Sequence, residues 1–381
     1  MMASEIANAA VRTQPLCLFL CGDVMLGRGV DQILPHPGKP QLFEPCVRSA
    51  LDYVKLAERA TGKLPSPAAY AYPWGDALAV LARRQPQARI INLETAVTTS
   101  DAHAPGKSVH YRMHPGNLAC LSEAGIDCCV LANNHVLDWG SAGLDETLRL
   151  LHDAGIRTAG AWRDAAQAAA PAILDTPGRG RLLVYAYGCE TAGVPQAWAA
   201  GARRDGINFL SDYSIESADR IARHVSQGRR AGDVVVISLH WGDNWGFDIS
   251  NPERAFARRL IDAGAADIIH GHSSHHIRGI EIYRGKPVLY GCGDFLNDYE
   301  GISGHENCRP DLTLMYFPVV NPASGVVVEF TAVPMQIRHF RVGHAPDEGV
   351  SWLHATLSRE STRYGVDVER DGRTNTFTLR W

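Results

Sequence analysis

The sequence lacks the short motifs of several common enzyme classes. It contains no G-x-x-x-x-G-K-[ST] phosphate loop, and no G-x-G-x-x-G follows an apolar run. The serines of the "GHSSHH" segment do not stand in the G-x-S-x-G setting of a nucleophile elbow. These absences argue against ATP-driven ligation by this chain alone and against a serine hydrolase.

Long runs of one charge and long apolar runs are also missing. The 37 basic and 41 acidic side chains give a formal net charge of -4, so we expect no nucleic-acid partner. The apolar run nearest the N-terminus covers only residues 16–21, which is too short for an export signal or a membrane span. We therefore expect a cytoplasmic protein without a membrane partner.

Cysteine is present without a pattern. The nine cysteines form an odd set with no C-x-x-C pair, and several lie in apolar runs such as "CCVLA". This placement favours reduced core residues over disulfides or a zinc knuckle.

What the chain does contain is an alternation of apolar runs and amphipathic segments. With 381 residues and 45% hydrophobic content it has the profile of a large globular protein. Alternating strands and helices predict an α/β fold with mainly parallel pairing. A hairpin around Arg284-Gly285-Lys286 and antiparallel strands are expected later in the chain, and 62–73 is expected to be a loop. The predicted strands cover 16–21, 88–93, 126–132, 181–187, 233–239 and 266–271, and the predicted helices cover 141–155 with Ser141 as a cap, 214–228, and 251–264 with Pro252 at its first position.

Polar residues follow five of the predicted strands. In open α/β sheets the crevice at the carboxyl ends of the strands is where ligands bind. Carboxylate, amide oxygen and imidazole together suit zinc, manganese or ferrous iron, and one bridging carboxylate can hold two ions about 3.5–4 Å apart. We therefore expect one or two divalent metal ions at this edge. The residues concerned are Asp23, Glu94, Asn134 with its neighbour His135, His240, and His272 with His275 three positions on.

Each of these residues also has an ordinary structural interpretation. Asp23 and Asn134 are residue types that form turns, and a buried His240 can bond to backbone. For His270, directly before Gly271, a supporting or core role is expected rather than metal binding. Asp294 is a candidate to hold a ligand histidine in place. Arg28 and Arg112 are candidates to bind an anion, with a solvated surface position as the alternative.

Six blocks of the sequence resemble a known family. In order they are "CGDVMLGRG", "INLETAV", "GKSVHYRMHPGNLACLSEAGIDCCVLANNHVLDWG", "SLHWG", "GHSSHH" and "GKPVLYGCGDFLND". Over roughly residues 16–300 they resemble the CapA-like proteins of poly-γ-glutamate capsule biosynthesis, in the calcineurin-like metallophosphoesterase superfamily. The resemblance implies a metallophosphoesterase-like β-sandwich of two mixed sheets flanked by helices, with the metal site at the carboxyl ends of the strands. We expect this domain to span 14–345, with a helix and strand extension over 346–381 packed on it.

The resemblance also implies a role for each candidate. Asp23 would bind the first metal, Glu94 would bridge, and Asn134 and His240 would bind the second. His272 and His275 resemble the closing pair, one for each metal, while His135 would assist the leaving group. Two departures stand out. Met25 occupies the place of a usual histidine, which leaves open whether one or two ions bind, and the longer closing block leaves His275 and His276 as alternatives.

Three functions remain open from the sequence. The first is a hydrolase in which metal-activated water attacks a phosphoester or related small anion, with His135 and Arg28 as catalytic residues. The second is an enzyme or accessory protein that makes or remodels poly-γ-glutamate or another γ-glutamyl amide. The third is a metal-binding protein without turnover. The oligomeric state, the substrate and the metal are left open.

Overall fold

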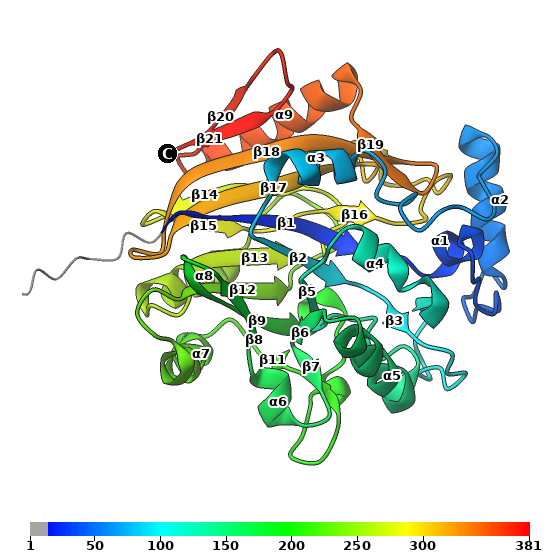
Figure 1. Cartoon of the computed structure of the whole chain (residues 1–381), viewed down its shortest axis with the longest axis horizontal. Coiled ribbons are helices and arrows are strands. Elements are labelled where there is room, and N and C mark those ends of the chain that lie inside the picture. Colours follow the sequence, from blue (N-terminus) through cyan, green and yellow to red (C-terminus); the bar gives the residue numbers. More distant parts are fainter. Residues whose placement is uncertain (1–13) are drawn as a thin grey trace, which may run out of the picture.

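The computed structural model describes residues 14–381 and shows four layers, with two stacked β-sheets between two layers of helices (Figure 1). The expectation of no export leader rests partly on residues 1–13, and these lie outside the described residues. The layered α/β arrangement confirms the fold class expected from the sequence.

The first sheet is mixed and, within the described residues, has ten strands. Its centre is parallel, because β1, β2, β5 and β6 run side by side in the same direction. The late strands β17, β18 and β19 join it in antiparallel order, as expected. The strands are β1 (Leu16–Val24), β2 (Ala88–Leu93), β5 (Cys128–Val130), β6 (Arg157–Ala159), β16 (Asp294–Leu296), β17 (Leu312–Asn321), β18 (Val326–Arg338), β19 (Arg341–His344), β20 (Asp367–Arg370) and β21 (Phe377–Arg380).

The second sheet has seven strands in the same part of the chain. Strands β9, β12, β13 and β15 are parallel, and β14 with β15 forms the hairpin predicted around Arg284. Its strands are β8 (Ala172–Thr176), β9 (Gly180–Cys189), β11 (Phe209–Leu210), β12 (Val234–His240), β13 (Ile268–His272), β14 (Ile280–Tyr283) and β15 (Lys286–Leu289). Two short ladders complete the strands: β3 (Ala96–Val97) with β4 (Arg112–Met113), and β7 (Ala161–Trp162) with β10 (Gly206–Ile207).

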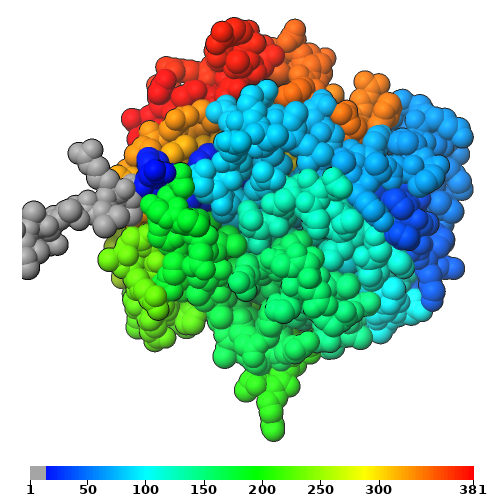
Figure 2. Space-filling view, in the orientation of Figure 1, coloured from blue at the N-terminus to red at the C-terminus, as the bar shows by residue number. Residues whose placement is uncertain are grey.

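Both faces of the central strands are buried, which explains their nearly continuous apolar sequences. On β1, Leu18 and Leu20 face the second sheet, where they pack with β9, β12 and β13. Phe19 and Cys21 face the other way, into a core formed with α3, α4 and α5. A third core lies between the second sheet and helices α7 and α8. Chain segments coloured cyan to green, which include α3, α4 and α5, cover the face seen in Figure 2.

The predicted helices are present with small differences at their ends. Ser214 caps α7, and Ser250 caps α8 through a reciprocal bond pair with Glu253. The expected cap at Ser141 is wrong, because α5 already begins at Gly140, and Pro252 is the second residue of α8. The helices are α1 (Arg28–Ile33), α2 (Ala50–Thr61), α3 (Ala77–Arg84), α4 (Ala119–Glu123), α5 (Gly140–Asp153), α6 (Ala165–Ala169), α7 (Ile215–Gly228), α8 (Asn251–Asp262) and α9 (Asp347–Thr362), with 3-10 turns at Pro115–Asn117, Glu190–Ala192, Gln196–Trp198 and Glu306–Cys308.

Other features of the described chain bear on the sequence expectations. Residues 62–73 form neither helix nor strand, as expected. The nine cysteines are all free and six of them are buried, although Cys46 is exposed.

At the C-terminal end, β21 pairs with β18, and α9 contributes Leu353 and Leu357 to the core between the sheets. Among residues 14–381, no helix combines the length and apolar composition needed to cross a bilayer.

Candidate metal centre

Strands from both sheets deliver polar side chains to one point. Asp23 comes from β1 of the first sheet, and His240 and His272 end β12 and β13 of the second. One ligand atom from each of the three lies within 4.8 Å of the others. All three side chains are buried, so water cannot compensate these polar atoms fully. The residues can therefore hold a metal ion, as the sequence predicts for this edge.

Strand register brings the two histidines together. His240 and His272 are direct partners in the parallel ladder between β12 and β13. Their Nδ1 atoms face each other at 2.9 Å, and His272 Nδ1 lies 3.6 Å from Asp23 Oδ1. Two imidazole nitrogens and a carboxylate oxygen thus converge, which is the donor set that borderline divalent metals prefer.

A buried hydrogen-bond chain fixes the tautomer of His272. His270 Nε2 donates to the carbonyl oxygen of Cys21 at 2.7 Å, and burial lowers the pKa of His270 to about 4, so its Nδ1 carries no proton. That Nδ1 accepts from the Ser238 hydroxyl at 3.2 Å. The Ser238 oxygen must then accept from His272 Nε2, 2.8 Å away. The lone pair of His272 is consequently on Nδ1, directed at the centre.

The oxygen side of the centre is held by amides and a backbone N–H. Asn92 Nδ2 donates to Asp23 Oδ1 at 2.7 Å, and the backbone N–H of Ser273 donates to Oδ2 at 3.1 Å. Asn133 Nδ2 donates to Asn92 Oδ1 at 2.9 Å, which fixes the orientation of that amide. Glu94 directly follows β2, and the nearby Asp23 carboxyl helps to raise its pKa. The carboxyl groups of Asp23 and Glu94 are therefore adjacent, as the bridging role requires.

A close approach of two glycines places a further carboxylate beside Asp23. A Cβ on Gly22 would stand 1.5 Å from the carbonyl oxygen of Gly293, so only glycine fits at this crossing. Strand β16 can then pair with the end of β1, with Asp294 opposite Asp23. Asp294 Oδ1 lies 3.0 Å from His275 Nδ1 and Oδ2 accepts from Asn297 at 2.7 Å. Asp294 therefore orients His275, as the sequence suggests.

The structure separates the two candidate closing histidines. His275 bonds to Asp294 and influences the pKa of Asp23. His276 instead bonds through Nδ1 to the carbonyl oxygen of Ile277 and packs against Phe247, with ring centroids 4.6 Å apart. His275 is therefore the one of the two whose ring contacts Asp294, the strand partner of Asp23, although neither belongs to the group of Asp23, His240 and His272.

Electrostatics also fit a cation. Burial and the neighbouring Asp294 raise the pKa of Asp23 to about 7, and burial with Asp23 and Asp294 raises the pKa of Glu94 well above its usual value. Burial lowers the pKa values of His240 and His272 far below the ordinary histidine value, so both are neutral at pH 7. Crowded carboxylates beside neutral imidazoles form a site that a divalent cation would stabilise.

Several buried side-chain atoms have no hydrogen-bond partner within the described residues, and two of them belong to predicted ligands. They are Asn134 Oδ1 and His240 Nε2. Buried polar atoms are normally paired, so the unpaired Asn134 oxygen is consistent with coordination, and the unpaired ring nitrogen shows that His240 is not fully engaged by the protein. Met25, in the place of the usual histidine, is buried and offers only a thioether.

His135 is held beside the centre by residues that the sequence reasoning did not assign. Its Nδ1 lies 2.6 Å from Asp138 Oδ2, and Lys107 bonds to the other Asp138 oxygen. Tyr111 stacks on the His135 ring with centroids 3.8 Å apart. His135 Nε2 is left facing Glu94 Oε1 at 3.7 Å. Burial and the nearby Lys107 lower the pKa of His135 to about 4, so the ring is neutral with a free lone pair on Nε2.

The two arginines are engaged within the protein. Arg28 donates to Asp298 through Nε at 2.9 Å and Nη2 at 2.5 Å, to Glu44 through Nη1 at 2.9 Å, and lies over the Tyr53 ring. Arg112 donates to the Ser100 carbonyl oxygen at 2.7 Å and lies over Trp139. This arrangement does not favour the anion-binding role expected for Arg28, whose guanidinium instead ties α1 to the segment after β16.

The sequence identified the residues at the strand ends, but not most of the residues that hydrogen-bond to them and hold them in place. Ser238 looked like an ordinary strand residue, and Asn92 like a strand-end residue. A local signal existed only for Asp138, because a carboxylate three positions after His135 in a turn can reach its ring. The supporting residues are Asn92, Lys107, Asn133, Asp138 and Ser238.

Fold and site together define an α/β protein of two stacked sheets with a candidate metal centre where strands of both sheets end. A family model described as bacterial capsule synthesis protein PGA_cap matches residues 17–299. The chain therefore belongs to this family, which confirms the CapA-like resemblance.

Two sequence relatives agree with this assignment. The chain is 47% identical, over 92% of both proteins, to a probable polyglutamine synthesis accessory protein of Mycobacterium tuberculosis. It is 24% identical to the PGA biosynthesis protein CapA of Bacillus subtilis, over 90% of this chain and 76% of that protein. A crystal structure of a phosphatase from Mycoplasma pneumoniae is similar with a TM-score of 0.47 and 11% identity, covering 85% of this chain and 94% of the other.

Proposed function

We propose that this protein is a metal-dependent hydrolase that cleaves a phosphoester or a related bond in a small anionic substrate. The observation that carries the proposal is the convergence of Asp23, His240 and His272 within 4.8 Å. Metal-ligand side chains grouped beside a buried His–Asp pair are the parts that hydrolysis of an ester needs.

The proposed ligands come from both sheets. Asp23, Glu94, Asn134, His240, His272 and His275 would hold one or two ions of manganese, iron or zinc. A bridging position for Glu94 is supported by its closeness to Asp23, whose charge helps to raise the pKa of Glu94. Met25 leaves the first metal position with one ligand fewer, so both one ion and two ions per chain fit the proposal, and metal analysis distinguishes them.

A bound divalent cation would lower the pKa of water and offset negative charge on the substrate. The protein contributes orientation and a proton acceptor. His135 Nε2 would take the proton of the attacking water as the new P–O bond forms, and would return it to the oxygen that departs as the ester P–O bond breaks. Asp138 holds the Nδ1 proton during both transfers, and so keeps Nε2 as the reacting atom.

This role differs in emphasis from the one expected from the sequence. A histidine whose pKa is lowered to about 4 by burial and by Lys107 arrives at the reaction without the extra proton that a general acid needs. We therefore assign His135 first as acceptor and only then as donor to the leaving group.

The experiment loads the purified protein with manganese, ferrous iron or zinc and assays phosphate monoesters and diesters. We expect turnover that falls about 100-fold or more in Asp23→Asn and His135→Gln. Asp153→Asn and His152→Gln are matched controls, because these two side chains are 59% and 76% exposed on α5. Inactivity with every metal, or full activity in Asp23→Asn, would overturn the proposal.

A second candidate is the handling or cleavage of γ-glutamyl amides, with the same centre acting on an amide carbonyl. The names of the relatives from Mycobacterium tuberculosis and Bacillus subtilis support it. Release of glutamate from γ-linked oligomers, with phosphoesters untouched, would favour this candidate over the first. Metal binding without turnover of either substrate would instead favour a non-catalytic role.

A further inference from the structure

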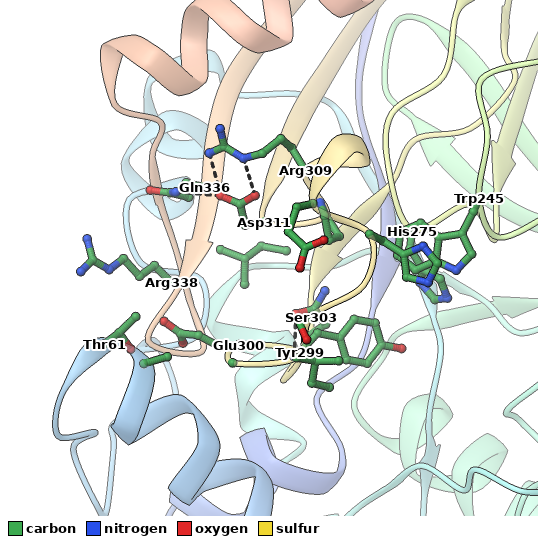
Figure 3. A pocket seen from close by; sticks show the side chains of 18 residues that line it. Thr61, Trp245, His275, Tyr299, Glu300, Ser303, Arg309, Asp311, Gln336 and Arg338 are labelled. Carbon is green, nitrogen blue, oxygen red and sulfur yellow. Dashed lines mark hydrogen bonds and ion pairs between the residues drawn. The ribbon is translucent and has the colours of Figure 1, made fainter.

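A cavity of about 600 Å³, shown in Figure 3, reaches His275, whose partner Asp294 pairs with Asp23 in the strand register. His275, which Asp294 orients, forms part of its wall together with Asn297 and Tyr299. The rest of the lining comes from the loop after β12, the segment between β16 and β17, the end of β18 and the end of α2. The volume lies in the range of small-molecule pockets.

Most polar side chains of the lining already have partners in the protein. Asp311 receives Arg309 Nε at 2.8 Å and Nη2 at 3.0 Å, and Gln336 Nε2 at 2.9 Å. Asn297 donates to Asp294 at 2.7 Å, and the Tyr299 hydroxyl lies 2.5 Å from that of Tyr111. These groups need no ligand to satisfy them, so they do not select a polar one.

The surface that remains is aromatic and aliphatic. Trp245 lies with its ring centroid 5.1 Å from that of His275, and it stacks on His305 at 3.7 Å with 6° between the planes. Figure 3 shows Trp245 and His275 side by side at one end of the pocket. Ile302, three residues before His305, is 52% exposed although it is a large apolar residue. The lining is completed by the side chains of Tyr299, Pro310 and Ile337.

The charge within the pocket argues against a polyanionic occupant. Glu300 Oε1 is buried without a hydrogen-bond partner in the described part of the chain, and its other oxygen accepts from the His339 backbone N–H at 2.7 Å. An anionic group of a ligand placed here would be repelled by the Glu300 carboxylate. The guanidinium of Arg338 points away from the other lining side chains in Figure 3.

We propose that this pocket is a substrate subsite for a flat apolar group, such as an aryl ring, joined to the anion that reacts at the centre. The proposal rests on the proposed function for the position of the anion, whereas the apolar contacts stand on the pocket alone. A ring held in this pocket would bury apolar area against lining side chains such as Trp245, Ile302 and Ile337, and contacts with aromatic side chains add to that gain.

The test begins with metal-free protein and the probe 8-anilinonaphthalene-1-sulfonate, an anion with flat apolar rings. We expect saturable binding that benzylphosphonate displaces and methylphosphonate does not. Ile302→Ser and Trp245→Ala should each weaken binding of the probe about tenfold. Ile215→Ser is the matched control, because Ile215 is 63% exposed at the start of α7. Circular dichroism verifies that the variants are folded.

Absence of probe binding by the wild type, or equal binding by Ile302→Ser, overturns the subsite. A second arm uses metal-loaded protein and compares phenyl phosphate with methyl phosphate. A lower KM for the phenyl ester, lost in Ile302→Ser, supports the subsite, and equal KM values contradict it. Probe binding with no hydrolysis of any ester would refute the proposed function and leave the subsite standing.

Discussion

His240 and His272 present their Nδ1 atoms to each other at 2.9 Å, at matching positions of two parallel strands. Neither strand is unusual by itself. Their register places two imidazoles where Asp23 reaches across from the other sheet, 3.6 Å from His272 Nδ1. The candidate centre is thus a product of how the two sheets stack.

The Ser238 hydroxyl should control metal affinity without touching the metal. Ser238→Ala removes the acceptor of the His272 Nε2 proton, so the lone pair is no longer confined to Nδ1. We expect metal affinity, measured by isothermal titration, to fall about 10- to 100-fold. In ¹⁵N NMR of the metal-free protein, His272 should change from the Nε2–H tautomer to a mixture. Ser226→Ala on the exposed side of α7 is the control. An unchanged tautomer in Ser238→Ala would refute the hydrogen-bond chain.

Metal affinity should depend on pH through Asp23. Burial and Asp294 raise the pKa of this carboxyl to about 7, so below that pH a cation must displace its proton. We expect affinity to weaken by at least about tenfold for each pH unit below 7, because the raised pKa of Glu94 adds to the effect of Asp23. His240 and His272 do not compete in the same way near pH 7, because burial lowers their pKa values well below the ordinary histidine value. Titrations between pH 5 and 8.5 measure the profile, and a flat profile would contradict it.

Asp138 should matter for turnover and not for metal content. Asp138→Asn keeps the shape of the side chain but removes the charge that holds the Nδ1 proton of His135 and pairs with Lys107. We expect kcat to fall about 100-fold while the metal content stays at the wild-type value. Asp153→Asn, exposed on α5, should leave both unchanged. Loss of metal in Asp138→Asn would show a structural role instead.

The crossing of β1 and β16 tolerates no side chain. In Gly22→Ala the new Cβ would lie 1.5 Å from the Gly293 carbonyl oxygen, so the strands must separate. We expect a loss of about 3 kcal/mol or more in the free energy of unfolding, measured with urea, together with weaker metal binding. Gly372→Ala, where a Cβ meets nothing within 4 Å, is the control. Equal stability of the two variants would show that the crossing can relax.

Local patterns predicted the strands and the residues at their ends. The apolar runs 88–93 and 233–239 correspond to β2 and β12, because strands buried on both faces need continuous apolar sequence. The carboxyl-end rule then brought Asp23, His240 and His272 to one edge from sequence alone. Segments with a clear hydrophobic pattern could be predicted without knowing which distant residues they contact.

The supports of the centre depend on contacts between distant parts of the chain. Arg28 was expected to face an anion, but its partner Asp298 lies 270 residues away, and no local pattern links the two. Strand β16 has three residues, too few for a periodic signal, yet it positions Asp294 beside Asp23. Ser238 is surrounded by apolar neighbours, and its function appears only once His270 and His272 stand next to it.

The most direct test of the metal centre is elemental analysis of protein purified without chelator, combined with titration of manganese, iron and zinc. We expect about one or two ions per wild-type chain, and a loss of at least half of the bound metal in both His240→Ala and His272→Ala. The control variant His152→Ala should bind as much metal as the wild type. Metal-free wild-type protein that binds none of the three ions, or His240→Ala and His272→Ala variants that bind as the wild type does, would contradict it.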